Sequence, residues 1–306
     1  MKRAAVFIAL NCAMALAGCA ALSSSATPEA SSGPVQPVID VASRVHALLP
    51  LDALLLGEQH DAPDHQRIHR EVIEALAARG ALAGVVLEMA MQGNSTASLL
   101  GGPANHSGRR GSEASEDAVR AALKWDEQAW PWGPYAPAIM AAVRAGVPVM
   151  GANMPRAQMG AAMQQPDLDQ RLNGPALKAQ QQLIRLGHCN LLPESQISPM
   201  TRIQIARDVA MANAIVQAHA SAELANASQP GKSAKTVVLL AGSGHVDRTL
   251  GVPQHLPPGL IAKSVLLVAG GESEAGGKAS DFDAVWAAAP VPAKDYCAGL
   301  KAKLPG

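Results

Sequence analysis

Three apolar stretches of this sequence end in side chains that can transfer protons or bind a metal ion. They are residues 53–61 (ALLLGEQHD), 84–89 (GVVLEM) and 236–245 (TVVLLAGSGH). Short apolar runs bounded by glycine are typical of buried strands, and ligands of open α/β sheets bind outside the carboxyl ends of the strands. We therefore predict one pocket at these strand ends, built from Glu58, His60, Glu88 and His245.

Two carboxylates and two imidazoles in one pocket suit two kinds of chemistry. The four residues can bind a divalent metal ion that activates water, as in a metal-dependent esterase or peptidase. They can also act as general acids and bases without a metal. In a third interpretation they only hydrogen-bond loop backbone, in a structural envelope protein. The residue types alone leave these interpretations open.

The composition favours an α/β fold with a mainly parallel sheet flanked by helices. Hydrophobic residues make up 48% of the 306 residues, but aromatic residues make up only 3%. Such an aliphatic core suits a buried parallel sheet covered by helices. Further strands are expected at residues 147–151, 264–269 and 281–286, and helices at residues 41–49, 63–79 and 136–145.

A helical subdomain is expected to be inserted before the strand that ends in GSGH. The segment concerned, residues 156–228, is long and rich in Ala and Gln. The α/β domain as a whole is predicted at residues 38–290, and residues 291–306 form a tail. Gly and Ser in residues 100–117 predict a surface loop.

The N-terminal residues are expected to lie outside the fold. Lys2 and Arg3 precede an apolar run that is too short for a membrane span of about 20 residues. A charged start followed by a short apolar run is typical of a signal peptide, which we expect at residues 1–18. The run ends in Leu-Ala-Gly-Cys, which resembles a bacterial lipobox whose lipidated residue is Cys19. Residues 19–37 are rich in Ser, Ala and Pro and predict a flexible tether.

The net charge bears on nucleic-acid binding, and the cysteine content bears on a possible disulfide. The formal net charge is zero at pH 7, so no basic face for nucleic acid is expected. With Cys12 in the signal peptide and Cys19 lipidated, Cys189 and Cys297 are left. A disulfide between them is compatible with an oxidising periplasm, but it depends on geometry that the sequence does not provide.

Two histidines and an arginine near the predicted pocket are further candidates. His65 and His69 lie four residues apart and therefore share one face of the helix predicted after GEQHD. Zinc-peptidase helices carry Glu directly after the first His, where this chain has Gln66. His65 either lines the site or faces solvent, and His69 is expected at the surface. Arg156, after the third predicted strand, can pair with a carboxylate or a ligand propionate.

Aromatic residues concentrate in one short segment. Residues 124–137 (KWDEQAWPWGPYAP) hold three of the four tryptophans and one of the two tyrosines. The segment is either a hydrophobic plug beneath a helix or an aromatic wall for a flat ligand, with Tyr135 supplying a phenol. Both interpretations remain open.

Several segments taken together resemble one protein family. They are the lipobox, GEQHD, LEM, the Trp-rich segment that ends in Tyr135, GANMPR, GHC, RDVAMA and GSGHV followed by GVP. Their order and spacing are similar to those of the ChaN family of bacterial haem-binding lipoproteins. That family belongs to a wider group with Tiki-type metalloproteases and erythromycin-esterase-like hydrolases, which share the GE-x-H turn and a late histidine.

The resemblance implies a role in haem and iron uptake. A ChaN-like chain binds haem, is anchored by lipid in the outer membrane and faces the periplasm, and two copies can form a homodimer around the haem. Ala20 directly after the lipidated cysteine, in place of Asp, fits outer-membrane sorting. The family's haem iron is held by tyrosine, which implies Tyr135 rather than Tyr296. Arg156 and His65 complete the predicted haem-binding set.

Overall fold

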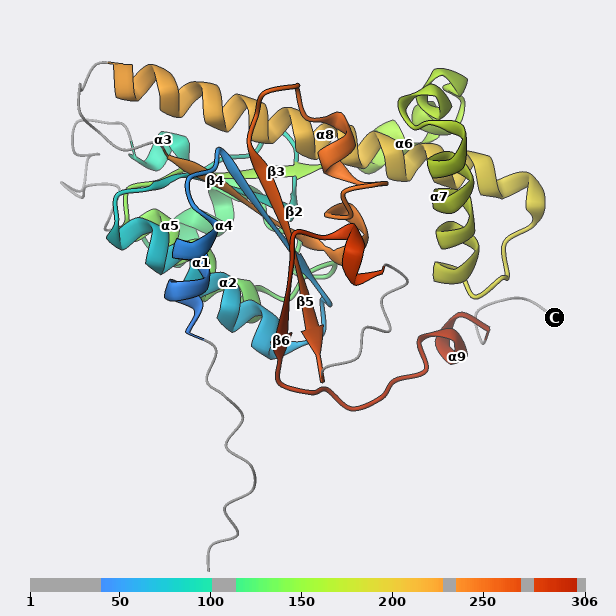
Figure 1. Ribbon diagram of the computed structural model, residues 1–306, viewed down its shortest axis with the longest axis horizontal. Coiled ribbons are helices and arrows are strands. Elements are labelled where there is room, and N and C mark those ends of the chain that lie inside the picture. The colour runs from blue at the N-terminus through green and yellow to red at the C-terminus, as the bar shows by residue number, and fades with distance from the viewer. Residues whose placement is uncertain (1–39, 101–113, 228–234, 271–277, 302–306) are drawn as a thin grey trace, which may run out of the picture. The chain divides into compact units, whose positions relative to one another are not determined.

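The computed structural model describes residues 40–100, 114–227, 235–270 and 278–301. Within them, six strands form one sheet in the order β3-β2-β4-β1-β5-β6, and every neighbouring pair is parallel (Figure 1). The strands are β1 (Ala53–Glu58), β2 (Leu82–Met91), β3 (Val149–Asn153), β4 (Thr236–Gly242), β5 (Ala262–Ala269) and β6 (Ala284–Ala288). This all-parallel sheet with flanking helices confirms the predicted α/β class.

The central strands are buried on both faces, which explains their continuous apolar sequences. Successive side chains of a strand point to opposite faces of the sheet. In β1, Leu54 and Leu56 therefore pack into one core, whereas Ala53 and Leu55 pack into the core on the other face. Parallel sheets covered on both faces require this pattern.

Helices cover each face of the sheet (Figure 1). One core contains the buried faces of α1 (Val41–Leu48), α2 (Pro63–Ala78), α4 (Glu116–Leu123) and α5 (Trp132–Arg144). The other contains the buried face of α8 (Glu194–Ala227), a helix of 34 residues that contacts β2, β3 and β4. The sheet is thus enclosed between two helical layers.

Helix α2 starts and stops where its sequence predicts. Pro63 occupies the first turn, where its missing N–H costs nothing. Ile68 and Val72 are buried on its inner face. Gly80 adopts a φ of +65°, which glycine tolerates, and this ends the helical run.

Most of the described chain between β3 and β4 is helical. It forms α6 (Arg156–Met163), η2 (Pro166–Arg171), α7 (Gly174–Gly187) and α8. Helices α6 and α7 pack against α8, and Leu172 and Ala176 share a small separate core with Ile205 of α8. Through α8, this helical segment adjoins the sheet.

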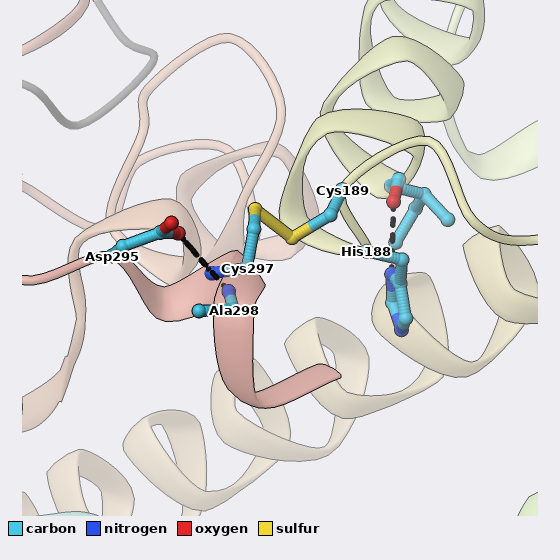
Figure 2. Close-up of a disulfide and its surroundings, with 6 residues drawn as sticks. His188, Cys189, Asp295, Cys297 and Ala298 are labelled. Carbon is cyan, nitrogen blue, oxygen red and sulfur yellow. Dashed lines mark hydrogen bonds between the residues drawn. A yellow bond between two sulfur atoms is a disulfide. The ribbon is translucent and has the colours of Figure 1, made fainter. Parts of the chain in front are cut away.

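The chain after β6 returns to the end of α7. Residues 289–295 have no regular structure and lead into α9 (Tyr296–Lys301). A disulfide joins Cys297 of α9 to Cys189, two residues after the end of α7 (Figure 2). The pairing that the sequence left open is therefore present in the structure.

Several short elements complete the chain. These are α3 (Ala97–Leu100), η3 (Ser243–His245), η4 (Val252–His255) and η5 (Ala279–Asp281). The predicted signal peptide, tether and lipidated Cys19 lie outside the described residues, as does most of the loop predicted at residues 100–117. Among the helices of the described residues, none has the length and apolarity that a membrane span requires.

Candidate functional site

The carboxyl ends of β1, β4 and β2 lie side by side in the middle of the sheet. The register places Glu58, at the end of β1, beside Gly242 at the end of β4. Glu88 directly follows the last β2 residue that pairs with β4. The structure brings together the four side chains that the sequence indicated, Glu58, His60, Glu88 and His245.

The glycine before Glu58 allows the segment after β4 to approach β1. A Cβ atom at Gly57 would lie 2.4 Å from Cγ2 of Val246 and 3.0 Å from Cα of Ser243. No side chain fits this space, so glycine is required for the close approach. The contact holds the turn that carries His245 against the end of β1.

Glu58 is the centre of a buried hydrogen-bond network. Its Oε1 atom lies 2.6 Å from Nδ1 of His60 and accepts a hydrogen bond of 2.8 Å from the hydroxyl of Tyr135. Its Oε2 atom accepts a 2.9 Å hydrogen bond from Nε2 of Gln66 on α2. Glu58 is only 1% exposed, so these partners replace the water that its charge loses.

Glu88 holds the second half of the site. Its Oε1 atom lies 3.3 Å from Nε2 of His245, and its Oε2 atom accepts a 2.7 Å hydrogen bond from the N–H of Gly242. On the other side of the ring, Nδ1 of His245 lies 2.5 Å from Oδ1 of Asp208 on α8. His245 is therefore clamped between two buried carboxylates.

An irregularity in β2 aims Glu88 at the site. Leu87 pairs with Gly151 and Met91 pairs with Asn153, so three residues of β2 lie opposite one residue of β3. Extra residues of this kind bend a strand and redirect its side chains. The side chain of Glu88 is consequently available to the neighbouring β4 and its loop.

His60 connects the two halves and keeps one free ring nitrogen. Its Nε2 atom lies 3.8 Å from Oε2 of Glu88, which is too long for a hydrogen bond. Its ring packs edge-on against Trp130, with ring centroids 4.8 Å apart, and its side chain is 38% exposed. The Nε2 atom of His60 can therefore contact a ligand.

Neighbouring carboxylates raise the pKa of both imidazoles. Burial lowers the pKa of His245, but the charges of Glu88 and Asp208 outweigh it and raise the pKa to about 10. Burial likewise opposes the charged form of His60, while the hydrogen bond to Glu58 and the charge of Glu88 raise its pKa. The ring of His245 is therefore a cationic donor at neutral pH.

The pKa values of the neighbouring acidic groups are also shifted by burial and by these charged partners. Burial alone would raise the pKa of Glu58 and of Glu88, but the neighbouring histidines reverse this effect and both pKa values are lowered. Asp208 differs, because burial dominates and raises its pKa to about 6. The pKa of Tyr135 is also raised, by burial and by the charge of Glu58, so its phenol stays protonated.

Two cavities meet at His60 and Asp61. A polar cavity of about 770 Å³ lies at the strand ends and is lined by the four predicted residues together with Gln204, Ser243, Gly187 and Tyr296. An apolar cleft of about 630 Å³ lies between α2 and the start of α5. The cleft is lined by Trp130, Tyr135, four prolines and two arginines, Arg67 and Arg70. Both volumes fall in the range of small-molecule sites.

The four clustered side chains pair with one another rather than forming a metal site. In the part of the chain that the structure describes, no group of three or more His, Cys, Asp or Glu side chains is arranged to hold a metal ion. The divalent metal predicted for this set is therefore not supported by its geometry.

A family model matches residues 45–256 and is described as "Haem-binding uptake, Tiki superfamily, ChaN". The chain belongs to the ChaN family. A similar solved structure is "Cofacial heme binding to ChaN of Campylobacter jejuni", with 23% sequence identity, a TM-score of 0.58, and coverage of 79% of this chain and 89% of that chain. At this identity the similarity establishes a shared fold, and it agrees with the family resemblance found in the sequence.

Other comparisons are less informative. The type III effector HopBA1 has a solved structure with 16% identity and a TM-score of 0.43 over 82% of this chain and 94% of that chain. No curated protein sequence matches this ChaN-family chain.

The residues predicted to bind haem lie in three different environments of this ChaN-family chain. Tyr135 lines the apolar cleft but is only 2% exposed, and its hydroxyl donates to Glu58. His65 lines neither of the two cavities and does not face solvent: it is buried, and its Nδ1 atom accepts a 2.9 Å hydrogen bond from the N–H of Gln59. Arg156 is exposed at the start of α6 and lines neither cavity.

The prediction that His69 lies at the surface is wrong. His69 is fully buried, and its Nδ1 atom lies 3.5 Å from Oε2 of Glu58. Burial lowers its pKa, so the ring is neutral. The sequence contained a signal for this position, because His65, His69, Val72 and Leu76 follow the 4-3-4 spacing of one buried helix face.

The aromatic segment of the ChaN-family chain is divided between the core and the apolar cleft. Trp132 is buried in the core and packs edge-on against Trp125, with the ring centroids 5.0 Å apart. Trp130 instead lines the apolar cleft and touches His60. The segment is therefore a plug at one end and a cavity wall at the other.

Proposed function

We propose that this chain binds haem in the apolar cleft and takes part in haem or iron uptake. The observation that carries the proposal is the cleft itself, an aromatic and proline-lined cavity of about 630 Å³ whose lining also includes two arginines and the imidazole of His60. A flat apolar ring system with two carboxylate groups matches those features. Family membership supports the same ligand.

Individual residues of the cleft suit separate parts of haem. Trp130 offers an aromatic face to the porphyrin. Arg67 already pairs with Asp64 and Glu71, whereas the buried Nε atom of Arg70 has no hydrogen-bond partner among the described residues. Arg70 is therefore the better partner for a propionate.

Two side chains of the cleft could approach the iron. Haem would supply a ferric centre that accepts a nitrogen or phenolate ligand. His60 presents Nε2 and has the exposure to do so, although its raised pKa opposes the deprotonation that iron ligation requires. Tyr135 would have to leave its hydrogen bond to Glu58.

A hemin titration tests the proposal. The full chain should give a saturable Soret shift, and Trp130→Ala should weaken binding by about tenfold, the equivalent of roughly 1.4 kcal/mol. Trp130→Phe, which keeps an aromatic wall, should bind nearly as tightly as the wild type. A linear, non-saturable absorbance change in the wild type would contradict haem binding.

We further propose that Cys19 anchors the chain in the outer membrane with the domain facing the periplasm. The supporting observation is the lipobox-like sequence that ends at Cys19. Fractionation of cells should place the wild type in the outer membrane and a Cys19→Ser variant outside that fraction.

A homodimer around the haem is tested by sedimentation velocity with and without hemin, and an unchanged sedimentation coefficient at saturation would exclude it.

A second candidate function is hydrolysis in the polar cavity. It is favoured by one observation, the unbonded Nε2 atom of His60 beside the carboxylate of Glu88. In its protonated form, His60 can stabilise an oxyanion while the neighbouring carboxylate activates water. Ester and peptide substrates should be cleaved by the wild type and not by Glu88→Gln. Elemental analysis of the purified chain distinguishes a metal-dependent reaction from this metal-free one.

A further inference from the structure

The C-terminal segment crosses the carboxyl-terminal edge of the sheet. We call residues 289–297 the strap. It begins after β6, has no regular structure before α9, and is almost entirely exposed. Such a segment has few buried apolar contacts of its own, which places it among the least stable parts of a fold.

Polar contacts hold the strap to the loop after β1. The hydroxyl of Tyr296 lies 2.9 Å from Oδ1 of Asp61, and the same hydroxyl accepts a hydrogen bond from Nε2 of Gln59 at 3.0 Å. Lys294 forms a 3.0 Å ion pair with Asp61. Lys294 and Asp61 are both exposed, so this ion pair adds little stability.

The disulfide is the covalent anchor of the strap. It joins Cys297 to Cys189, 108 residues earlier in the chain, and Asp295 caps the short helix that carries Cys297 (Figure 2). Cross-links over long loops remove a large part of the freedom of the open chain. Without the disulfide, exposed polar contacts would be left to hold the end of the strap at Tyr296 in place.

Both sides of this anchor border the polar cavity. Gly187, at the end of α7, and Tyr296, directly before Cys297, line it together with His60 and His245. The described lining of the apolar cleft includes no residue of the strap. The strap therefore lies at the rim of the polar cavity and away from the apolar cleft.

We propose that the strap is a redox-dependent lid: the Cys189–Cys297 disulfide holds it at the rim of the polar cavity, where it narrows access, and reduction of the disulfide widens the entrance to that cavity. A dithiol reductant supplies the electrons. Its first thiolate attacks one sulfur and breaks the S–S bond, and its second thiolate resolves the mixed disulfide. The products are two cysteine thiols, which take the two protons, and the oxidised reductant. The lid does not depend on haem being the ligand.

A cysteine reporter in the cavity wall tests the proposal. Ser243 lines the polar cavity, so Ser243→Cys places a thiol in the cavity wall. Its labelling by a bulky polyethylene glycol maleimide is followed by peptide mass spectrometry in the full chain. In the Cys189→Ser/Cys297→Ser background, labelling should be faster by about fivefold or more, because the lid opens locally. Ser221→Cys, at an exposed position of α8, is the matched control and should label at one rate in both backgrounds. Equal rates for Ser243→Cys in the two backgrounds would overturn the proposal.

Two further measurements separate a lid from other effects of the disulfide. When Asp61→Asn is added with the disulfide intact, maleimide labelling of the Ser243→Cys reporter should stay slow. Fast labelling in this variant would show that the polar contacts, not the disulfide, hold the strap. Hydrogen exchange of the wild type with dithiothreitol should increase in peptides spanning residues 289–299 and stay unchanged in β1 and β4. Loss of protection in the strands would mean that the disulfide holds the whole fold, which contradicts a local lid.

Discussion

The ring of His245 lies between Glu88 and Asp208, with Nε2 3.3 Å from one carboxylate and Nδ1 2.5 Å from the other. All three side chains are almost completely buried. A buried charge is tolerated when its partners are close and its hydrogen bonds are made. The imidazolium therefore holds β2, α8 and the turn after β4 together at the site.

Replacing Glu88 should release His245 from this arrangement. In Glu88→Gln the pKa of His245, now raised to about 10, should fall markedly, because the charge that contributes most to the increase is lost. Breaking a buried pair by neutralising one partner should also lower the free energy of unfolding by about 3 to 5 kcal/mol. NMR titration of the ring protons and urea unfolding measure the two effects.

A matched substitution controls for loss of charge alone. Glu74→Gln, on the exposed part of α2, should change the free energy of unfolding by less than about 0.5 kcal/mol and leave the His245 titration unchanged. If Glu88→Gln behaved like Glu74→Gln, the buried pairing would not contribute to stability.

The stability of the fold should decrease at alkaline pH. The pKa of His245 is raised in the folded state from 6.5 to about 10. Its contribution is therefore complete below pH 6.5 and is lost as the pH rises towards 10. Urea unfolding at several pH values between these limits should show a declining free energy of unfolding. His245→Gln should be less stable at neutral pH and should lose less over the same range; parallel curves for the two proteins would contradict this assignment.

The strand-end residues could be predicted because their positions depend on local sequence. An apolar run that ends in Glu58, or in Glu88, shows where the strand leaves the sheet, and parallel strands bring such ends together. The strand containing Thr236 to Gly242 was recognised in the same way. Fold class followed from the same runs and from the aliphatic composition.

The partners of these residues depend on long-range packing, which the sequence does not reveal. Nothing in the sequence distinguishes Asp208 from the other polar residues of its helix, and only the crossing of α8 over the sheet buries it beside His245. Tyr296 lies in a tail without periodicity, and the disulfide fixes its place at the polar cavity. Arg70 could not be distinguished from other helix surface residues before the cleft was known.

Gly242 should be intolerant of a side chain, because His60 occupies the space beside it. A Cβ atom there would lie 2.9 Å from Nε2 of His60 and 3.5 Å from Oε2 of Glu88. Gly242→Ala should displace the ring and lower the free energy of unfolding by about 1 to 3 kcal/mol. Gly244→Ala is the control, since a Cβ atom there meets nothing within 4 Å. Urea unfolding, together with NMR shifts of His60, compares the two, and equal effects would show that the space beside His60 is not restricted.

Arg70 should contribute more to hemin binding than Arg67, although both line the apolar cleft. Arg67 is engaged by Asp64 and Glu71 at 2.5 and 2.6 Å, whereas the nearest carboxylate to Arg70, that of Glu74, is 3.8 Å away. An uncommitted guanidinium can form a charge-assisted hydrogen bond with a propionate. Arg70→Ala should therefore weaken hemin binding by about tenfold, Arg67→Ala should have a smaller effect, and Arg79→Ala, outside the cleft, should have none. Fluorescence quenching during hemin titration measures the three affinities, and an Arg70→Ala affinity equal to that of Arg79→Ala would place the propionates elsewhere.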